Sequence, residues 1–142
     1  MVNQSTTMER LACYEDDRGV VFEPIEPMEL RSQQNVHLVL TQPGKIRGNH
    51  YHGTGTEVVV LVGPAFARIH ECGETKDIIV PEGDVVRFVI PPGIPHAFQN
   101  TGTDVMILLA FNTVAHDRAH PDTFPCILIG ETNGKASSPD AP

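Results

Sequence analysis

The stretch GKIRGNHYHGTGTE, residues 44–57, contains two histidines at alternate positions and an acidic residue after a short Gly/Thr segment. Successive residues of a β-strand point to opposite faces, so His50 and His52 are expected to project from the same side. Glu57 lies an odd number of positions further on and would face the other way on a straight strand. The segment 53–56 therefore predicts a turn that brings Glu57 back beside the two imidazoles.

A second stretch, PPGIPHAFQN at residues 91–100, supplies another histidine. Its prolines and glycine favour a tight, rigid turn that places His96 at the start of a strand. Imidazole nitrogens and a carboxylate oxygen form a site suited to zinc, iron, manganese, nickel or cobalt. The sequence thus predicts a divalent metal ion at His50, His52, Glu57 and His96. The alternatives are polar residues that merely line a barrel mouth, or the same site working without an ion.

Short apolar runs rich in β-branched residues flank both stretches, and Pro/Gly turns recur every eight to twelve residues or so, a spacing typical of short antiparallel strands. The runs lie at 36–40, 57–62, 84–90 and 105–111. A hairpin is expected with its tip at residues 72–74, and residues 27–32 favour a single helical turn. The fold class is therefore all-β, either a barrel or a sandwich.

Length and composition limit the rest. A chain of 142 residues that is 40% hydrophobic fits one domain, expected at 11–130 between a flexible lead-in at 1–10 and a disordered tail at 131–142. A net charge of −8 argues against nucleic acid or an anionic membrane as partner. The start of the chain lacks the apolar stretch of a signal peptide, and the cysteines form no CxxC pair, so a cytoplasmic location is expected.

Together, the two stretches resemble the two motifs of the cupin superfamily, G-x5-H-x-H-x(3,4)-E-x6-G and G-x5-P-x-G-x2-H-x3-N. The resemblance implies a double-stranded β-helix (cupin or jelly-roll) barrel over roughly residues 36–112, with the histidines and glutamate as metal ligands. The sequence departs from these motifs at two spacings. Five residues rather than six separate Glu57 from Gly63, and seven rather than five separate Gly83 from Pro91. The matching residues are Gly44, His50, His52, Glu57 and Gly63, then Gly83, Pro91, Gly93, His96 and Asn100.

A narrower resemblance involves Asp17-Arg18-Gly19, the phrase RGNHYH, the long strand before IPPG and the segment HPDTF at 120–124. These features look like cupins that modify nucleotide sugars, such as the C-terminal cupin domain of the capsular-polysaccharide epimerase/reductase and the dTDP-sugar 3,4-ketoisomerases. The resemblance implies zinc, a small-molecule substrate such as a keto nucleotide sugar, and an epimerase or isomerase of carbohydrate biosynthesis. Small cupins commonly dimerise, so a homodimer is expected, with strands around 20–25 pairing across its interface.

Several residues near the predicted site are candidates for further roles. His37 could face the cavity as a general base, or be a satisfied edge histidine. Lys45 and Arg47, with Arg87, could hold a phosphate, or be solvated charges. Phe98 could line the pocket, or belong to the core.

Three functions remain open from the sequence. The first is metal-assisted proton transfer beside a sugar ketone. The second is an iron-dependent dioxygenase or other oxidoreductase acting on a small molecule, since three histidines and a glutamate leave coordination positions open. The third is a metal-dependent binding module without turnover. The fold alone does not choose among them.

Overall fold

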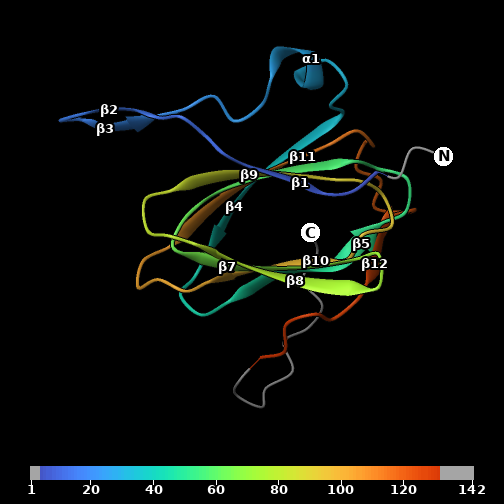
Figure 1. Ribbon diagram of the computed structural model, residues 1–142. Coiled ribbons are helices and arrows are strands. Elements are labelled where there is room, and N and C mark those ends of the chain that lie inside the picture. Colours follow the sequence, from blue (N-terminus) through green and yellow to red (C-terminus); the bar gives the residue numbers. More distant parts are fainter. Residues whose placement is uncertain (1–3, 132–142) are drawn as a thin grey trace.

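The computed structural model of the protein describes residues 4–131 and consists of two five-stranded antiparallel sheets stacked face to face (Figure 1). The first sheet is ordered β1 (Thr7–Arg10), β9 (Val85–Ile90), β6 (Glu57–Val62), β11 (Met106–Asn112) and β4 (Asn35–Thr41). The second is ordered β12 (Thr123–Pro125), β5 (Ile46–His52), β10 (His96–Asn100), β7 (Ala65–Glu71) and β8 (Glu74–Val80). Strands distant in sequence are neighbours in both sheets, as the predicted all-β cupin barrel requires.

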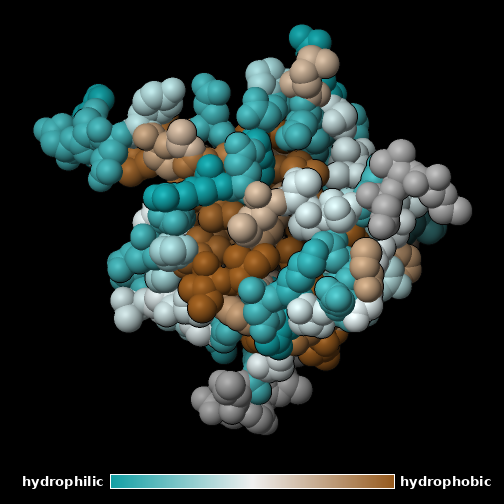
Figure 2. All heavy atoms as spheres, in the orientation of Figure 1, coloured by the Kyte–Doolittle hydropathy of each residue, from teal (hydrophilic) through white to brown (hydrophobic). Residues whose placement is uncertain are grey.

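The two sheets are held together by apolar side chains that alternate along their strands. In β7, every second residue from Ala65 is buried, whereas β6 is buried on both faces from Val58 to Leu61. The main core lies between the sheets, where Phe88 and Phe98 pack with their rings 5.3 Å apart. Figure 2 shows hydrophobic residues gathered between the two layers, with hydrophilic residues above and below them.

A second apolar cluster covers the outer face of the first sheet. It contains Val58 and Val60 of β6 and Phe111 of β11, with Ile25 and Phe22 of the N-terminal segment packed over them. The predicted helical turn is confirmed as α1 (Pro27–Leu30), which follows this covering segment. The outer cluster explains why β6 is a continuous hydrophobic run rather than an alternating one.

The N-terminal region differs from the prediction of a flexible lead-in at residues 1–10. Thr7–Arg10 form β1, which pairs with β9 from Thr7 opposite Val89 to Arg10 opposite Val86. Arg87, a predicted phosphate candidate, is buried and donates from Nη2 to Glu9 Oε2 at 2.6 Å, so it anchors the lead-in instead of facing a ligand. The polar sequence TMER carries no apolar alternation, so its strand depends on this pairing.

The predicted tail at 131–142 falls, apart from Glu131, outside the described residues. Between residues 4 and 131 the only helix is α1. It is four residues long, which is too short to cross a membrane.

A short hairpin, β2 (Tyr14–Asp16) and β3 (Gly19–Val21), extends away from the two layers (Figure 1). Its two strands pair with each other and form a separate two-stranded sheet. All six residues are exposed, including Tyr14, Val20 and Val21. An isolated two-stranded hairpin is marginal in water, so this element needs further packing to be stable.

Candidate metal centre

The four predicted ligands reach the interior from both sheets. His50 and His52 lie at the end of β5 and His96 begins β10 in the second sheet, whereas Glu57 begins β6 in the first. One donor atom from each residue lies within 4.8 Å of the others. The turn at 53–56 therefore does what the sequence predicted, returning Glu57 to the side of the two imidazoles.

A β-bulge in β5 orients the first of these histidines. His96 lies opposite His50, but the next residue, Ala97, lies opposite Gly48, so Asn49 has no partner in this ladder. Gly48 and Asn49 both adopt positive φ, 84° and 54°. A Cβ on Gly48 would approach the His96 carbonyl oxygen to 2.6 Å, so only glycine fits there. The bulge also places Arg47 and His50 on the same cavity wall, although an odd number of positions separates them.

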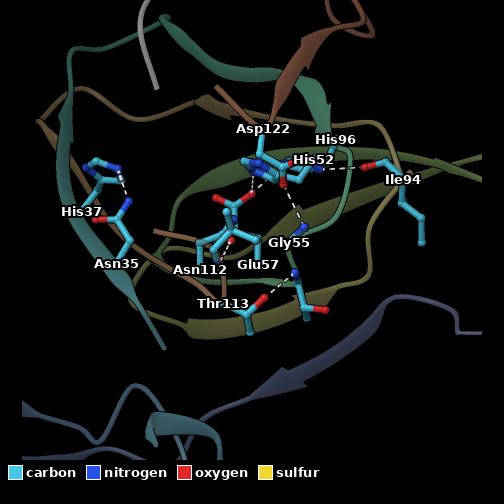
Figure 3. A network of polar contacts seen from close by, with 12 residues as sticks. Asn35, His37, His52, Gly55, Glu57, Ile94, His96, Asn112, Thr113 and Asp122 are labelled. Atoms are coloured by element: carbon cyan, nitrogen blue, oxygen red, sulfur yellow. Dashed lines mark hydrogen bonds and ion pairs between the residues drawn. The ribbon is translucent and has the colours of Figure 1, made fainter. Parts of the chain in front are cut away.

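His96 presents an unprotonated nitrogen to the centre of the cluster. Its Nδ1 lies 2.9 Å from the carbonyl oxygen of Ile94, which can only accept, so Nδ1 carries the proton of the neutral ring. The Nε2 lone pair then faces Glu57 Oε2 at 3.0 Å, and this buried nitrogen has no hydrogen-bond partner. Two acceptors facing each other without a proton between them are a suitable setting for a cation (Figure 3).

The charges of the cluster depend on its burial. Burial by itself would raise the pKa of Glu57, but the hydrogen bond with His52 and the electrostatic influence of the neighbouring His96 and His52 rings outweigh it and hold that pKa well below the ordinary value. His52 Nε2 lies 2.6 Å from Glu57 Oε2. Burial lowers the pKa of His52, but this contact, the Glu57 charge, and the charge and backbone of Asp122 raise it overall. Without a metal, the raised pKa of His52 therefore favours the protonated ring beside the carboxylate.

His50 behaves in the opposite way. Burial, together with the neighbouring His96 and His52 rings, lowers the pKa of His50 from 6.5 to about 4. At neutral pH its ring is unprotonated and its lone pair is available. The residues present thus fit a divalent cation, since they offer a carboxylate and imidazole nitrogens of the kind that such ions bind.

The cluster opens into a cavity of about 80 Å³ between the sheets. His37 and Asn35 of β4 line it, and the two side chains are hydrogen bonded at 2.9 Å between His37 Nε2 and Asn35 Nδ2. Figure 3 shows them across the cavity from the cluster. His37 thus faces the interior, and the His116 ring lies 5.8 Å from it.

The predicted substrate-binding residues differ in position. Arg47 lines the cavity, with Nε 3.2 Å from Thr41 Oγ1. Phe98 also lines it and is nearly fully buried, so it serves as both wall and core. Lys45 lies on the exposed turn before β5 and is not part of the cavity wall, because the turn around Gly44 carries it outside the barrel.

Sequence reasoning missed Asn112 and Asp122, which also line the cavity. Asn112 lies opposite Glu57 in the β6–β11 ladder, and a Cβ on Gly55 would come within 2.2 Å of its Oδ1. Asp122 belongs to the HPDTF segment, which resembled nucleotide-sugar cupins but suggested no role for a particular residue. Alternation along β4 could have predicted that Asn35 faces the same side as His37.

A barrel of two antiparallel sheets enclosing a cluster of histidines and a glutamate defines a cupin. More narrowly, the chain belongs to the polysaccharide biosynthesis C-terminal domain family, whose model matches residues 14–124. The relationship expected from the motifs is therefore confirmed.

Known relatives are sugar-modifying proteins. A UDP-2-acetamido-2,6-beta-L-arabino-hexul-4-ose reductase from Pseudomonas aeruginosa is 29% identical over 123 residues, which cover 83% of this chain and 32% of that protein. The chain thus spans about a third of the length of this curated relative. The capsular polysaccharide assembling protein CapF from Staphylococcus aureus is 26% identical, with a TM-score of 0.58 over 83% of this chain and 33% of that one.

The sugar 3,4-ketoisomerase QdtA from Thermoanaerobacterium thermosaccharolyticum, solved in complex with TDP, superimposes with a TM-score of 0.66. The match covers 87% of this chain and 89% of that chain, at 16% identity. At this identity the similarity shows the fold alone.

The pKa of His50 predicts how the metal-free protein responds to acid. The unfolded chain takes up a proton at this histidine near pH 6.5, but the folded protein does so only near pH 4. Stability therefore falls as pH decreases from 6.5, by about 2 kcal/mol between pH 7 and pH 5. The raised pKa of His52 adds stability as pH falls from 7 and offsets part of the loss at His50, whereas the lowered pKa of Glu57 acts only below its ordinary value, outside this range.

Urea unfolding at the two pH values, in the presence of a chelator, measures this effect. His50→Gln should remove most of the loss because glutamine does not titrate. His120→Gln, on an exposed loop, is the matched control and should retain it. Equal losses in the wild type and His50→Gln would contradict the assignment.

Proposed function

We propose that the protein binds one divalent metal ion, preferably zinc, through His50, His52, Glu57 and His96, and catalyses proton transfer on a keto nucleotide sugar. The observation that supports this most is the buried Nε2 of His96, which lies 3.0 Å from the Glu57 carboxylate and has no hydrogen-bond partner. Iron, manganese, nickel and cobalt suit the same donor set. When bound, the ion would supply a positive charge that makes a proton beside a carbonyl group easier to remove.

The substrate class is supported by the relatives. The Pseudomonas aeruginosa relative is named as a reductase of a UDP-linked hexul-4-ose, which is a keto sugar. QdtA is named as a sugar 3,4-ketoisomerase and was solved with TDP. A proton transfer beside a ketone is the step common to isomerases and epimerases of such sugars. The activity proposed for this chain is therefore that of an isomerase or epimerase.

The cavity residues of this chain fit separate roles in the reaction. His37 lies across the cavity from the cluster, and its Nε2 lone pair, which accepts from Asn35 Nδ2 here, would act as a general base after exchanging that donor for the substrate proton. Arg47 would attract the diphosphate, and the phenyl ring of Phe98 would form an apolar wall against the sugar. Lys45 is exposed and lies outside the cavity wall, so its proposed role is to attract the charged substrate toward the cavity.

Metal content tests the site itself. The purified protein should contain close to one divalent ion per chain, measured by inductively coupled plasma mass spectrometry. His52→Ala should lose most of it, because the imidazole removed lies 2.6 Å from the carboxylate. His70→Ala, at the edge of β7, should retain it. A folded His52→Ala protein with wild-type metal content would contradict the site, and a strong preference for iron would favour oxygenase chemistry.

Solvent exchange tests the reaction. Incubation with a 4-keto nucleotide sugar in deuterium oxide should incorporate deuterium at the carbon beside the ketone, as measured by mass spectrometry. His37→Gln should slow incorporation by at least about 100-fold, since a general base contributes 10²–10⁴-fold, while metal content stays unchanged. If a range of such sugars gives neither exchange nor a shift in melting temperature, the proposed substrate class is wrong.

The homodimer expected from the sequence is a further part of this proposal. The outer face of β4 and its neighbour β11 carries four exposed aliphatic side chains, 46–64% accessible, and β4 is an edge strand. The hairpin β2–β3, which exposes Tyr14, Val20 and Val21, extends from the same chain and pairs with no other sheet among the described residues. In a dimer, the β2–β3 hairpin of each copy would cover the outer face of β4 and β11 of the other copy. The four side chains are Val36, Leu38, Leu40 and Ile107.

Sedimentation equilibrium tests this assembly. The wild type should sediment as a dimer, and Leu38→Lys should shift it toward the monomer because a charge would enter the apolar contact. Ile79→Lys alters an even more exposed aliphatic residue on the other sheet and should leave the dimer intact. A monomeric wild type, or a dimer unaffected by Leu38→Lys, would count against the proposed interface.

A further inference from the structure

The turn between β5 and β6 determines whether the cluster can form. It has His52 at one end and Glu57 at the other, and it must reverse the facing of the chain between them. The turn is also tightly packed against Asp122 on one side and Asn112 on the other. A Cβ on Gly53 would lie 2.9 Å from Asp122 Oδ1, and one on Gly55 would lie 2.2 Å from Asn112 Oδ1. Small shifts of this turn would therefore move both ligands.

Asp122 binds this turn along most of its length. Its carboxylate accepts hydrogen bonds from the backbone N–H of Thr54 at 3.0 Å and from that of Gly55 at 2.8 Å. The hydroxyl of Thr54 donates to it at 3.2 Å, and the carbonyl oxygen of Asp122 accepts from the Gly53 N–H at 3.1 Å. The N–H groups of three consecutive turn residues thus end on one aspartate, which also lies beside the His52 ring (Figure 3).

The segment that carries Asp122 has other attachments. Thr123–Pro125 pair with β5 as β12, with Thr123 opposite His52. Further on, Asn49 Oδ1 accepts from the N–H groups of Leu128 and Ile129, at 2.9 and 3.0 Å. These contacts hold the C-terminal segment without the Asp122 carboxylate. The carboxylate therefore acts mainly on the turn and not on the attachment of its own segment.

We propose that Asp122 is a positioning residue for the metal centre: it does not bind the ion, but it fixes the turn at 53–55 so that His52 and Glu57 meet. This inference rests on the metal site proposed above. Asp122 belongs to neither of the two cupin motifs, and in the sequence it follows all four proposed ligands. Partners that orient ligands in this way typically change metal affinity 10- to 100-fold when they are mutated.

Cobalt binding to the metal-stripped protein tests this role, measured by chelator competition and by the visible spectrum of the bound Co²⁺. Asp122→Asn keeps the shape of the side chain but places an amide donor against the N–H groups of the turn. Its affinity should fall about 10- to 100-fold, and its spectrum should change because the ligand geometry changes. Asp77→Asn, on β8 two strands away from the His96 strand, removes an exposed ion pair with Arg68; it is the control and should bind as the wild type does.

Asp122→Glu separates position from charge, and it remains informative if the asparagine variant does not fold. It keeps the negative charge but moves the oxygens by one methylene, so its affinity should also fall. Wild-type affinity and spectrum in the Asn variant, or full recovery in the Glu variant, would overturn the positioning role. Failure of the wild type itself to bind Co²⁺ would instead overturn the proposed metal site, so the two failures are distinguishable.

Discussion

The convergence of acceptor atoms on one point inside the barrel is the constraint on which the site depends. The Glu57 carboxylate lies 2.6 Å from His52 Nε2 and 3.0 Å from His96 Nε2, in a place where solvent reaches little of any of them. Burying a carboxylate without a compensating positive charge is costly. The raised pKa of His52 favours a proton there that offsets the carboxylate charge in the metal-free protein, and a divalent ion would offset it more completely. The tautomer of His96, set by the Ile94 carbonyl, already leaves its lone pair in place for such an ion.

Regular strands alone would not produce this convergence. Alternation would place Arg47 and His50 on opposite faces of β5, and it would point Glu57 away from His52. The bulge at Asn49 corrects the first mismatch and the turn at 53–56 corrects the second. Both irregularities are held by the C-terminal segment: Asn49 binds Leu128 and Ile129, and the turn binds Asp122. The last part of the described chain therefore shapes a site whose proposed ligands all precede it.

Much of the fold was predictable because it depends on local patterns. The β-branched runs and the Pro/Gly turns predicted β4, β6, β9 and β11 to within one residue at each end. The spacing of His50 and His52, with a glycine-rich turn before Glu57, predicted which side chains meet. What could not be predicted depends on partners far away in the sequence. The pairing of β1 with β9, the ion pair of the buried Arg87 with Glu9 and the contacts of Asp122 all join segments that carry no local signal of each other.

X-ray absorption spectroscopy of the zinc-loaded protein tests the central claim most directly, because it reports the atoms that surround the ion. The account predicts three imidazole nitrogens and a carboxylate oxygen at about 2.0–2.2 Å, with any further ligand also oxygen or nitrogen. A sulfur shell at about 2.3 Å, or a shell of water oxygens with fewer than two imidazoles, would contradict it.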